Sequence, residues 1–206
     1  MRWFLEGGPL MWAVLVFFLC GGFMALIRAA LAKKAEFPGA GLNLAALLLG
    51  CGMIGTLHGW QQAFAAVAYA SAEMKAELLQ AGMDAAWHPT TLAMICVALL
   101  APLALIAMAR ARGRATTLVK VIGLGSGLLS FASVALALVI CVILSSQLMG
   151  MFDATDPVSA AQFITYGIWA GMAAAALGAL IALFGGLLLL PVGAVSAWKR
   201  RKEDEF

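Results

Sequence analysis

Charged residues are scarce in this chain: Asp, Glu, Lys and Arg make up 11% of its 206 residues, while 64% are hydrophobic. Soluble domains carry about a quarter charged residues, so this scarcity excludes a water-soluble globule. The formal net charge is only +3, which is too small to indicate a nucleic-acid partner. Proline is also rare, with 6 residues, which argues against long disordered tracts. We therefore expect an integral membrane protein.

Residues that carry catalysis or bind metals are equally scarce. The four cysteines form no CxxC or Cys/His spacing, so we expect neither a metal site nor a cofactor. The apolar runs hold no pair of carboxylates, and no Ser/His/Asp set has a spacing that supports nucleophilic catalysis. The sequence therefore predicts a protein that is not an enzyme.

Long apolar runs are what the sequence has in place of these groups. There are five, at 9–31, 42–70, 89–109, 121–151 and 160–197. Each is long enough to cross a hydrocarbon layer of about 30 Å as a helix. The ten-residue alternation of a membrane barrel is missing, so helices are expected. The predicted fold is an all-α integral membrane protein with five transmembrane helices, whose partner is the lipid bilayer.

The basic residues predict the orientation of these five spans. All but two of the 13 basic residues, Arg2 and Lys75, lie in segments that five spans bring to one side of the membrane. Basic loops favour the cytoplasmic side, so the N-terminus is expected outside and the C-terminus in the cytoplasm. An even number of spans would place basic segments on both sides of the membrane.

Small residues recur on one face of two of the runs. They are Gly52, Gly55 and Gly59 in the second run, and Gly167, Gly171 and Gly178 in the fifth. Small faces let helix backbones approach closely in lipid, so these glycines predict helix packing within or between subunits.

His58 lies in the interior of the second run, and Gln62 follows it by one helical turn. Intramembrane ionisable groups are candidates for proton relays. The alternative is a neutral histidine that is hydrogen-bonded to a neighbouring helix, and the sequence leaves both interpretations open.

Three segments, in this order and spacing, resemble the TolQ/ExbB/MotA proton-channel family. FLEGGPLMWAVLV (residues 4–16) resembles the family's entry into its first span. GCGMIGTLHGWQQAFAAVA (50–68) is similar to the GTV-x-G-x-x-x-AF signature of its second span. AGMDAAWHPTTLAMICVALLAPLAL (81–105) resembles the stretch that leads into its third span. The resemblance divides the chain into a three-span region, 1–112, and two further transmembrane helices, 113–206.

The resemblance implies an ion-driven complex of the bacterial inner membrane. Family members form a ring, typically of five subunits, around the single transmembrane helices of a partner dimer of the ExbD/TolR/MotB type, and proton or sodium flow moves ring against partner. By position, Thr56 matches the threonine of the GTV motif and Thr90 that of the third-span motif. The resemblance implies that both line the lumen of the ring.

The chain departs from the family pattern at one charged position. The family's third-span glutamate is replaced by Ala85, and Asp84 lies one residue away. The candidates for an ion pathway are therefore Thr56, Thr90, Asp84 and His58, with His58 as a substitute titrating group because its ordinary pKa is about 6.5. A non-conducting scaffold subunit that assembles through the glycine faces is the alternative function. A small transporter is disfavoured, because five spans give no clean inverted repeat.

Overall fold

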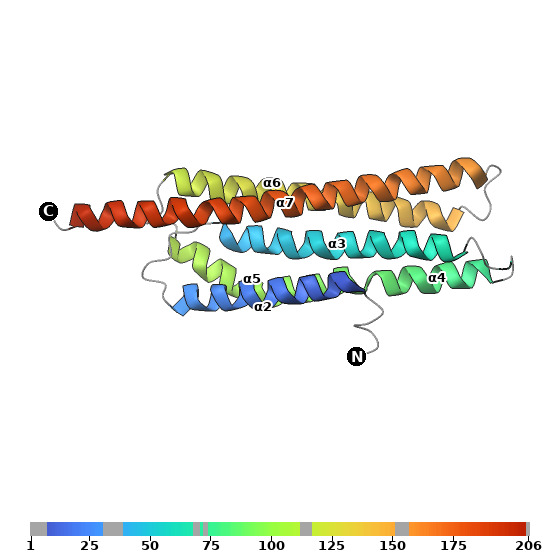
Figure 1. Cartoon of the computed structure of the whole chain (residues 1–206), viewed down its shortest axis with the longest axis horizontal. Helices are drawn as coiled ribbons and strands as arrows, with labels where there is room; N and C mark the ends of the chain where they lie inside the picture. Colours follow the sequence, from blue (N-terminus) through green and yellow to red (C-terminus); the bar gives the residue numbers. More distant parts are fainter. Residues whose placement is uncertain are drawn as a thin grey trace.

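In the computed structural model the chain is a bundle of long helices that run back and forth along one axis (Figure 1). The structure describes residues 8–30, 39–67, 71, 74–111, 117–150 and 157–204. The helices are α2 (Pro9–Ala30), α3 (Ala40–Val67), α4 (Lys75–Ala86), α5 (His88–Ala111), α6 (Thr117–Gly150) and α7 (Pro157–Asp204). These described ranges hold helices and no strand, which confirms the all-α prediction.

Four segments are long and apolar enough to cross a membrane, as expected for a multi-pass membrane protein. They are Ala40–Val67, Glu77–Leu103, Thr117–Gln147 and Ile164–Leu189. The remaining predicted span corresponds to α2, whose apolar part, Pro9–Met24, is shorter. The charged clusters at 33–34, 112–114 and 153–156, on which the predicted orientation depends, lie outside the described residues.

The segment before the third span differs from the prediction. The predicted apolar runs leave residues 71–88 as a connection between the second and third spans, but Lys75–Ala86 forms the helix α4, which α5 follows directly after Trp87. Most residues of this segment are good helix formers, such as Ala, Leu, Glu and Gln. Leu79 and Ala86 are buried, so α4 is held by packing as well as by propensity.

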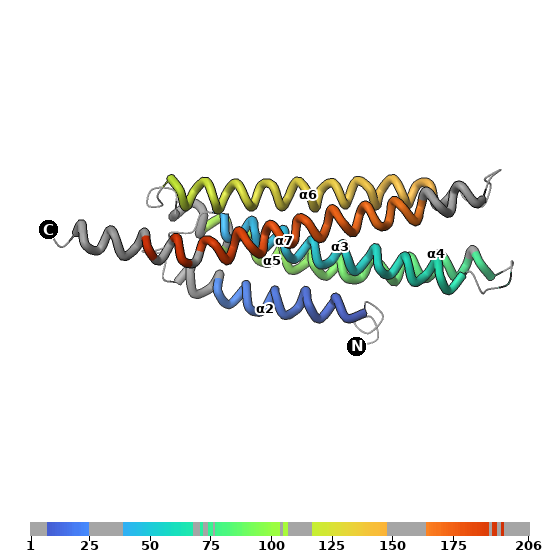
Figure 2. Tube along the Cα trace, turned by 45° about the horizontal axis from the view of Figure 1, so that its top comes forward, coloured from blue at the N-terminus to red at the C-terminus, as the bar shows by residue number. Residues whose placement is uncertain are grey.

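The helix α3 lies at the centre of the bundle. It contacts each of the other five helices, whereas α2 and α7 share few or no contacts (Figures 1 and 2). Of the most apolar stretch of α3, 56% is buried, against 28% to 33% in the other three long spans. The pair α6 and α7 packs along α3, so both predicted regions of the chain belong to one bundle.

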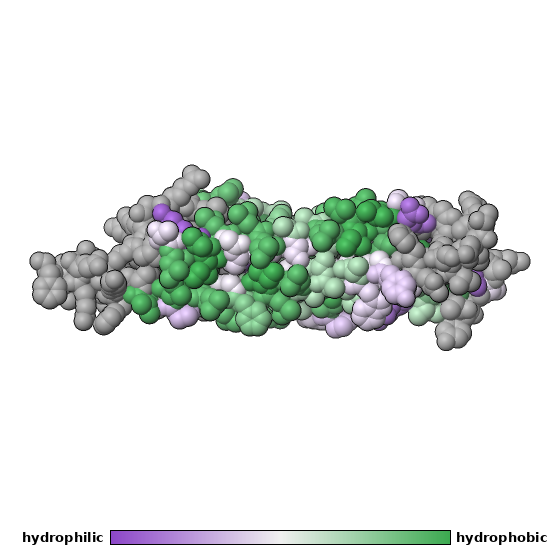
Figure 3. Space-filling model, turned by 90° about the horizontal axis from the view of Figure 1, so that it is seen from above, coloured by the Kyte–Doolittle hydropathy of each residue, from purple (hydrophilic) through white to green (hydrophobic). Residues whose placement is uncertain are grey.

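The outer surface of the bundle is apolar over most of its length. Figure 3 shows a broad band of hydrophobic side chains on the face formed by α6 and α7, with the more hydrophilic groups toward the two ends. The exposed side chains on these helices include Leu128, Leu136, Val142, Leu180 and Leu187, each at least half exposed. An apolar outer surface of this extent is typical of helices that face lipid.

Candidate functional site

Two threonines that come from different motifs meet between α3 and α5. The hydroxyl oxygens of Thr56 and Thr90 lie 2.7 Å apart, and both side chains are fully buried, with 0% and 1% exposure. Thr90 also donates to the sulfur of Met53 at 3.5 Å. Because a threonine hydroxyl carries a single proton, Thr56 is the donor to Thr90 whenever Thr90 donates to Met53. The three side chains thus form a short directional chain of hydrogen bonds.

Glycines on α3 make this close approach of α5 feasible. A Cβ atom on Gly52 would lie 2.8 Å from the Cβ of Ala93 and 3.0 Å from the Cα of Thr90. A Cβ on Gly55 would lie 2.7 Å from Pro89, and one on Gly59 would lie 2.6 Å from Ala86. The three glycines of the second run therefore form the surface on which α5 and the end of α4 rest, and a side chain at any of them would separate the two threonines.

The other two ion-pathway candidates do not join the threonine pair. His58 follows Thr56 by two residues, which turns its side chain by about 200°, to the far side of α3. There its Nε2 atom lies 3.1 Å from the amide nitrogen of Gln62, on an exposed part of the helix. Asp84 is exposed on α4. Ala85, at the position of the family's glutamate, is half-buried.

The resemblance implies that Thr56 and Thr90 line a lumen, and their burial limits how an ion could reach them. Within one chain both hydroxyls lie inside the bundle and not on its surface. A lumen between subunits would therefore reach them only after α3 and α5 separate.

A second buried polar cluster joins α3 to α6, and the sequence analysis missed it. The amide nitrogen of Asn43 donates to the carbonyl of Gly123 at 3.3 Å and to the hydroxyl of Ser126 at 3.0 Å. Asn43 is 3% exposed. Ser130, one turn further along α6, donates to the carbonyl of Ser126 and is fully buried. The sequence does carry a signal for this cluster, because Asn43 is a lone Asn in an apolar run and such residues form hydrogen bonds across helices in lipid.

Gly39 immediately precedes α3 and allows α3 to lie close to α6 at this cluster. Its φ angle is +89°, a conformation that residues with a Cβ rarely adopt. A Cβ at Gly39 would also collide with the backbone of Gly123, the residue whose carbonyl accepts from Asn43. The close backbone contact therefore brings the Gly123 carbonyl within reach of the buried Asn43 amide.

The two clusters lie on different sides of α3. Thirteen residues separate Asn43 from Thr56, which corresponds to a turn of about 220° around the helix. Asn43 accordingly bonds to α6, and Thr56 bonds to α5. The clusters do not form one polar file through the bundle.

The glycines of the fifth run also lie at helix contacts. A Cβ on Gly171 would lie 2.9 Å from Leu57 of α3, and one on Gly178 would lie 2.9 Å from the carbonyl of Ser130 on α6. A Cβ on Gly167 would collide with Leu144 of α6. These contacts bring α7 against α3 and α6, within a single subunit.

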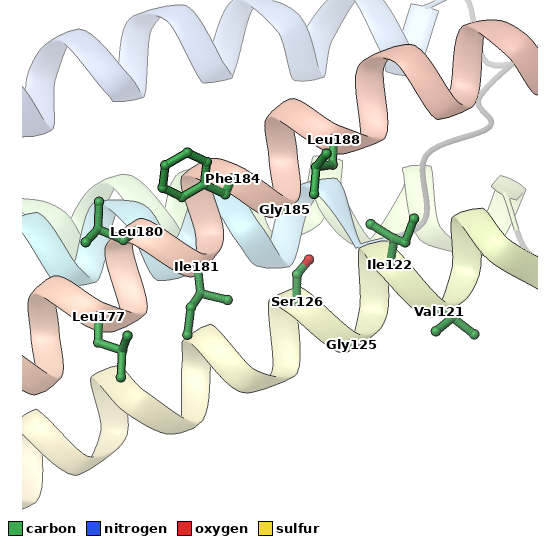
Figure 4. A pocket seen from close by; sticks show the side chains of 10 residues that line it. All are labelled: Val121, Ile122, Gly125, Ser126, Leu177, Leu180, Ile181, Phe184, Gly185 and Leu188. Carbon is green, nitrogen blue, oxygen red and sulfur yellow. The ribbon is translucent and has the colours of Figure 1, made fainter.

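A shallow groove of about 580 Å³ runs between α6 and α7 on the outer surface (Figure 4). Its lining is apolar apart from Ser126, with Val121 and Ile122 on α6 and Leu177, Phe184 and Leu188 on α7 among the lining residues. The hydroxyl of Ser126 is already bonded to Asn43. The surface of the groove is therefore apolar, and its lining residues include no set of polar groups suited to catalysis.

The cysteines show no chemistry of their own. Cys51, Cys96 and Cys141 are buried and Cys20 is exposed, and all four are unpaired. Among the described residues no group of His, Cys, Asp and Glu side chains is placed to hold a metal ion.

Comparison of the chain with protein-family models, with curated proteins and with solved structures finds no match. The resemblance to the TolQ/ExbB/MotA family therefore rests on the three sequence segments.

Proposed function

We propose that this chain is a subunit of an ion-driven energy-transducing complex of a bacterial inner membrane, similar to the TolQ/ExbB/MotA type. The observation that carries the proposal is the convergence of Thr56 and Thr90. They match threonines of two separate family motifs, 34 positions apart in the chain, and their hydroxyl oxygens lie 2.7 Å apart. A polar site shared by the second and third spans requires that residues from both motifs meet in this way.

Exposed aromatic residues on α7 support a placement of the bundle in the membrane. Tyr166 and Trp169 on α7 are 74% and 56% exposed. Gly171 contacts Leu57, so Trp169 lies close to the level of residue 58 on α3. Exposed Trp and Tyr favour the membrane–water interface. Under the predicted orientation this level is the outer interface.

The opposite interface lies about 30 Å away. Gly171 also contacts Ile140 of α6, and about 20 residues before Ile140 the sequence of α6 has its one charged residue, Lys120. Counting about 20 residues from Trp169 along α7 reaches Leu189, the end of the apolar segment. The last part of α3, α4 and the adjoining ends of α6 and α7 then project beyond the outer interface.

The threonine pair suits the handling of an ion. Each hydroxyl both donates and accepts a hydrogen bond, so the pair can exchange its present bonds for bonds to a passing hydrated ion or proton carrier. One charge that crosses 100 mV releases about 2.3 kcal/mol, and the pair, two residues from the level of residue 58, would meet the ion where it enters the hydrocarbon from the outer interface. The complex would be homo-oligomeric, a pentamer by resemblance, with a partner of the ExbD/TolR/MotB type whose single transmembrane helix supplies the carboxylate that Ala85 does not.

A second function, a non-conducting scaffold subunit, is favoured by a different observation. Thr56 and Thr90 are fully enclosed within one chain, and Ala85 stands where the family has a carboxylate. Under this function the threonine hydrogen bond only fixes α3 against α5.

Two measurements on the complex, gently extracted from its own membrane, separate these functions. Native mass spectrometry is expected to show five copies of the 21.5 kDa chain with two copies of a smaller one-span protein. After reconstitution into vesicles with a pH-sensitive dye, Thr90→Val is expected to lower proton flux about tenfold, since loss of a hydrogen bond to a charged group costs about 1.5 kcal/mol.

The matched control is Thr91→Val. Thr91 is exposed, and its hydroxyl donates to the Trp87 carbonyl of its own helix at 3.0 Å. Its replacement is expected to leave flux unchanged. Equal flux in all three proteins contradicts a role of Thr90 in ion flow, and no flux in the wild type favours the scaffold. A monomer contradicts both functions.

A further inference from the structure

Trp60, one helical turn beyond Thr56 on α3, has a buried N–H group in need of an acceptor. Its side chain is fully buried, with 0% exposure. In the part of the chain that the structure describes, the Nε1 atom of Trp60 has no hydrogen-bond partner. Because an indole is a donor only, and a buried donor that forms no bond costs free energy, a small molecule that accepts from Nε1 would stabilise the fold.

The hydroxyl of Thr56 has the opposite capacity. Its single proton is donated to Thr90 whenever Thr90 donates to the sulfur of Met53. The oxygen of a hydroxyl also has two lone pairs that accept hydrogen bonds. In this arrangement the Thr56 oxygen accepts nothing from Thr90, so it can accept a hydrogen bond from another donor.

Trp60 and Thr56 lie on the same side of α3. Four residues separate them, which corresponds to a turn of about 40° and a rise of about 6 Å. Long side chains on a helix lean toward its N-terminal end, so the indole of Trp60 extends toward the level of Thr56. Two hydrogen bonds through one water oxygen span about 5.5 Å. A single water molecule therefore has the reach to join the two groups.

We infer that Trp60 and Thr56 hold one buried water molecule between them. The water accepts from Nε1 of Trp60 and donates to the hydroxyl oxygen of Thr56. It thereby extends the chain of hydrogen bonds through Thr90 and Met53 by two groups, toward the outer end of the bundle. Trp60 lies two residues beyond the level of residue 58, where the proposed placement has the outer interface, so bulk water is near. The inference concerns the binding of water and holds for a channel subunit and for a scaffold alike.

The ring of Trp87 is the rival acceptor for the same N–H group. The rings of Trp60 and Trp87 meet edge to face, with their centroids 5.7 Å apart and an angle of 81° between their planes. An N–H group can donate to the face of an aromatic ring, but this bond is weaker than one to an oxygen. A water molecule is favoured because it bonds to Trp60 and Thr56 at once.

Nuclear magnetic resonance of the full-length chain in detergent, labelled with 15N-tryptophan, tests the inference. The indole signal of Trp60 is the one that disappears in Trp60→Phe. In the wild type its proton is expected to show a rotating-frame Overhauser contact with water, whose sign separates it from proton exchange. Thr56→Val keeps the shape of the side chain and removes the acceptor. It is expected to lose the contact, because a buried water needs at least two polar partners.

Two further variants serve as matched controls. Thr56→Ser keeps the hydroxyl and is expected to keep the contact with water. Thr90→Val removes the other member of the threonine pair but leaves the hydroxyl of Thr56 in place, so the contact is expected to remain there as well.

Three results would overturn the inference. One is a wild type without the contact, and an upfield shift of its indole proton would then place the N–H group on the face of Trp87. Another is an unchanged contact in Thr56→Val, since Thr56 then does not hold the water. The third is loss of the contact in Thr56→Ser and Thr90→Val as well, since packing and not the hydroxyl of Thr56 then controls it. None of these results depends on ion flux, so the inference and the proposed function fail separately.

Discussion

The two buried polar clusters on α3 differ in what their side chains bind. Asn43 donates to the backbone carbonyl of Gly123 and bonds to the hydroxyl of Ser126, both on α6. Thr56 and Thr90 bond to each other, and Thr90 donates to the sulfur of Met53, with no carbonyl involved in these bonds. Bonds to a fixed backbone hold two helices in register. Bonds between hydroxyls can be exchanged, so the threonine pair is the better candidate for a working site and the Asn43 cluster for a structural one.

The largest effect on stability is expected from a side chain added to the face of α3 that packs against α5. Gly52→Val places a side chain against Ala93 and the backbone of α5, and we expect a loss of about 3 kcal/mol of folding stability together with the loss of flux. The measurement is thermal unfolding of the purified protein in detergent. Gly125→Val on α6 is the control, because a Cβ there meets nothing within 4 Å. Equal unfolding temperatures would contradict the close packing of α3 on α5.

A smaller effect is expected on the Asn43 side. Asn43→Leu removes the donors to Gly123 and Ser126 and is expected to cost about 2 kcal/mol of stability, because buried partners lose their bonds. The same unfolding assay measures it. Ser146→Ala, whose exposed hydroxyl donates only to the Ile143 carbonyl of its own helix, is expected to cost about 0.5 kcal/mol or less. Flux per folded protein is expected to be unchanged in both variants, and a selective loss of flux in Asn43→Leu would reverse the assignment of roles.

The smallest effect concerns the coupling between the side chains. In a double-mutant cycle of Thr56→Val and Thr90→Val we expect a coupling free energy of about 1 kcal/mol. A cycle of Thr56→Val with Asn43→Leu is expected to be additive within about 0.5 kcal/mol, since the two residues bond to different helices. Strong coupling in the second cycle would show that the two clusters act as one network.

The sequence singled out the two threonines as ion-pathway candidates but not the Asn43 cluster, for physical reasons. Thr56 and Thr90 stand in two motifs whose spacing is visible along the chain, so the resemblance points to both residues. Asn43 finds Ser126 83 residues away, on a helix that shares no motif with α3. Only the packing of α6 on α3 brings them together.

Element boundaries show the same limit. The apolar runs predicted the long helices, because hydropathy over 20 residues is a strong signal. Lys75, Glu77 and Asp84 keep this segment out of the apolar runs, whereas helix propensity and the burial of Leu79 produce the helix α4. The helix that packs over Thr56 is set by the arrangement of the whole bundle, and the sequence of α3 alone does not contain that information.

The comparison of Thr56→Val with Asn43→Leu in one reconstituted complex tests the central claim most directly. Proton flux and unfolding temperature are measured on the same preparations. We predict that Thr56→Val lowers flux about tenfold and stability by only about 1 kcal/mol, while Asn43→Leu lowers stability more and leaves flux per folded complex unchanged. Flux that falls only in proportion to lost stability in both variants would contradict a working role for the threonine pair.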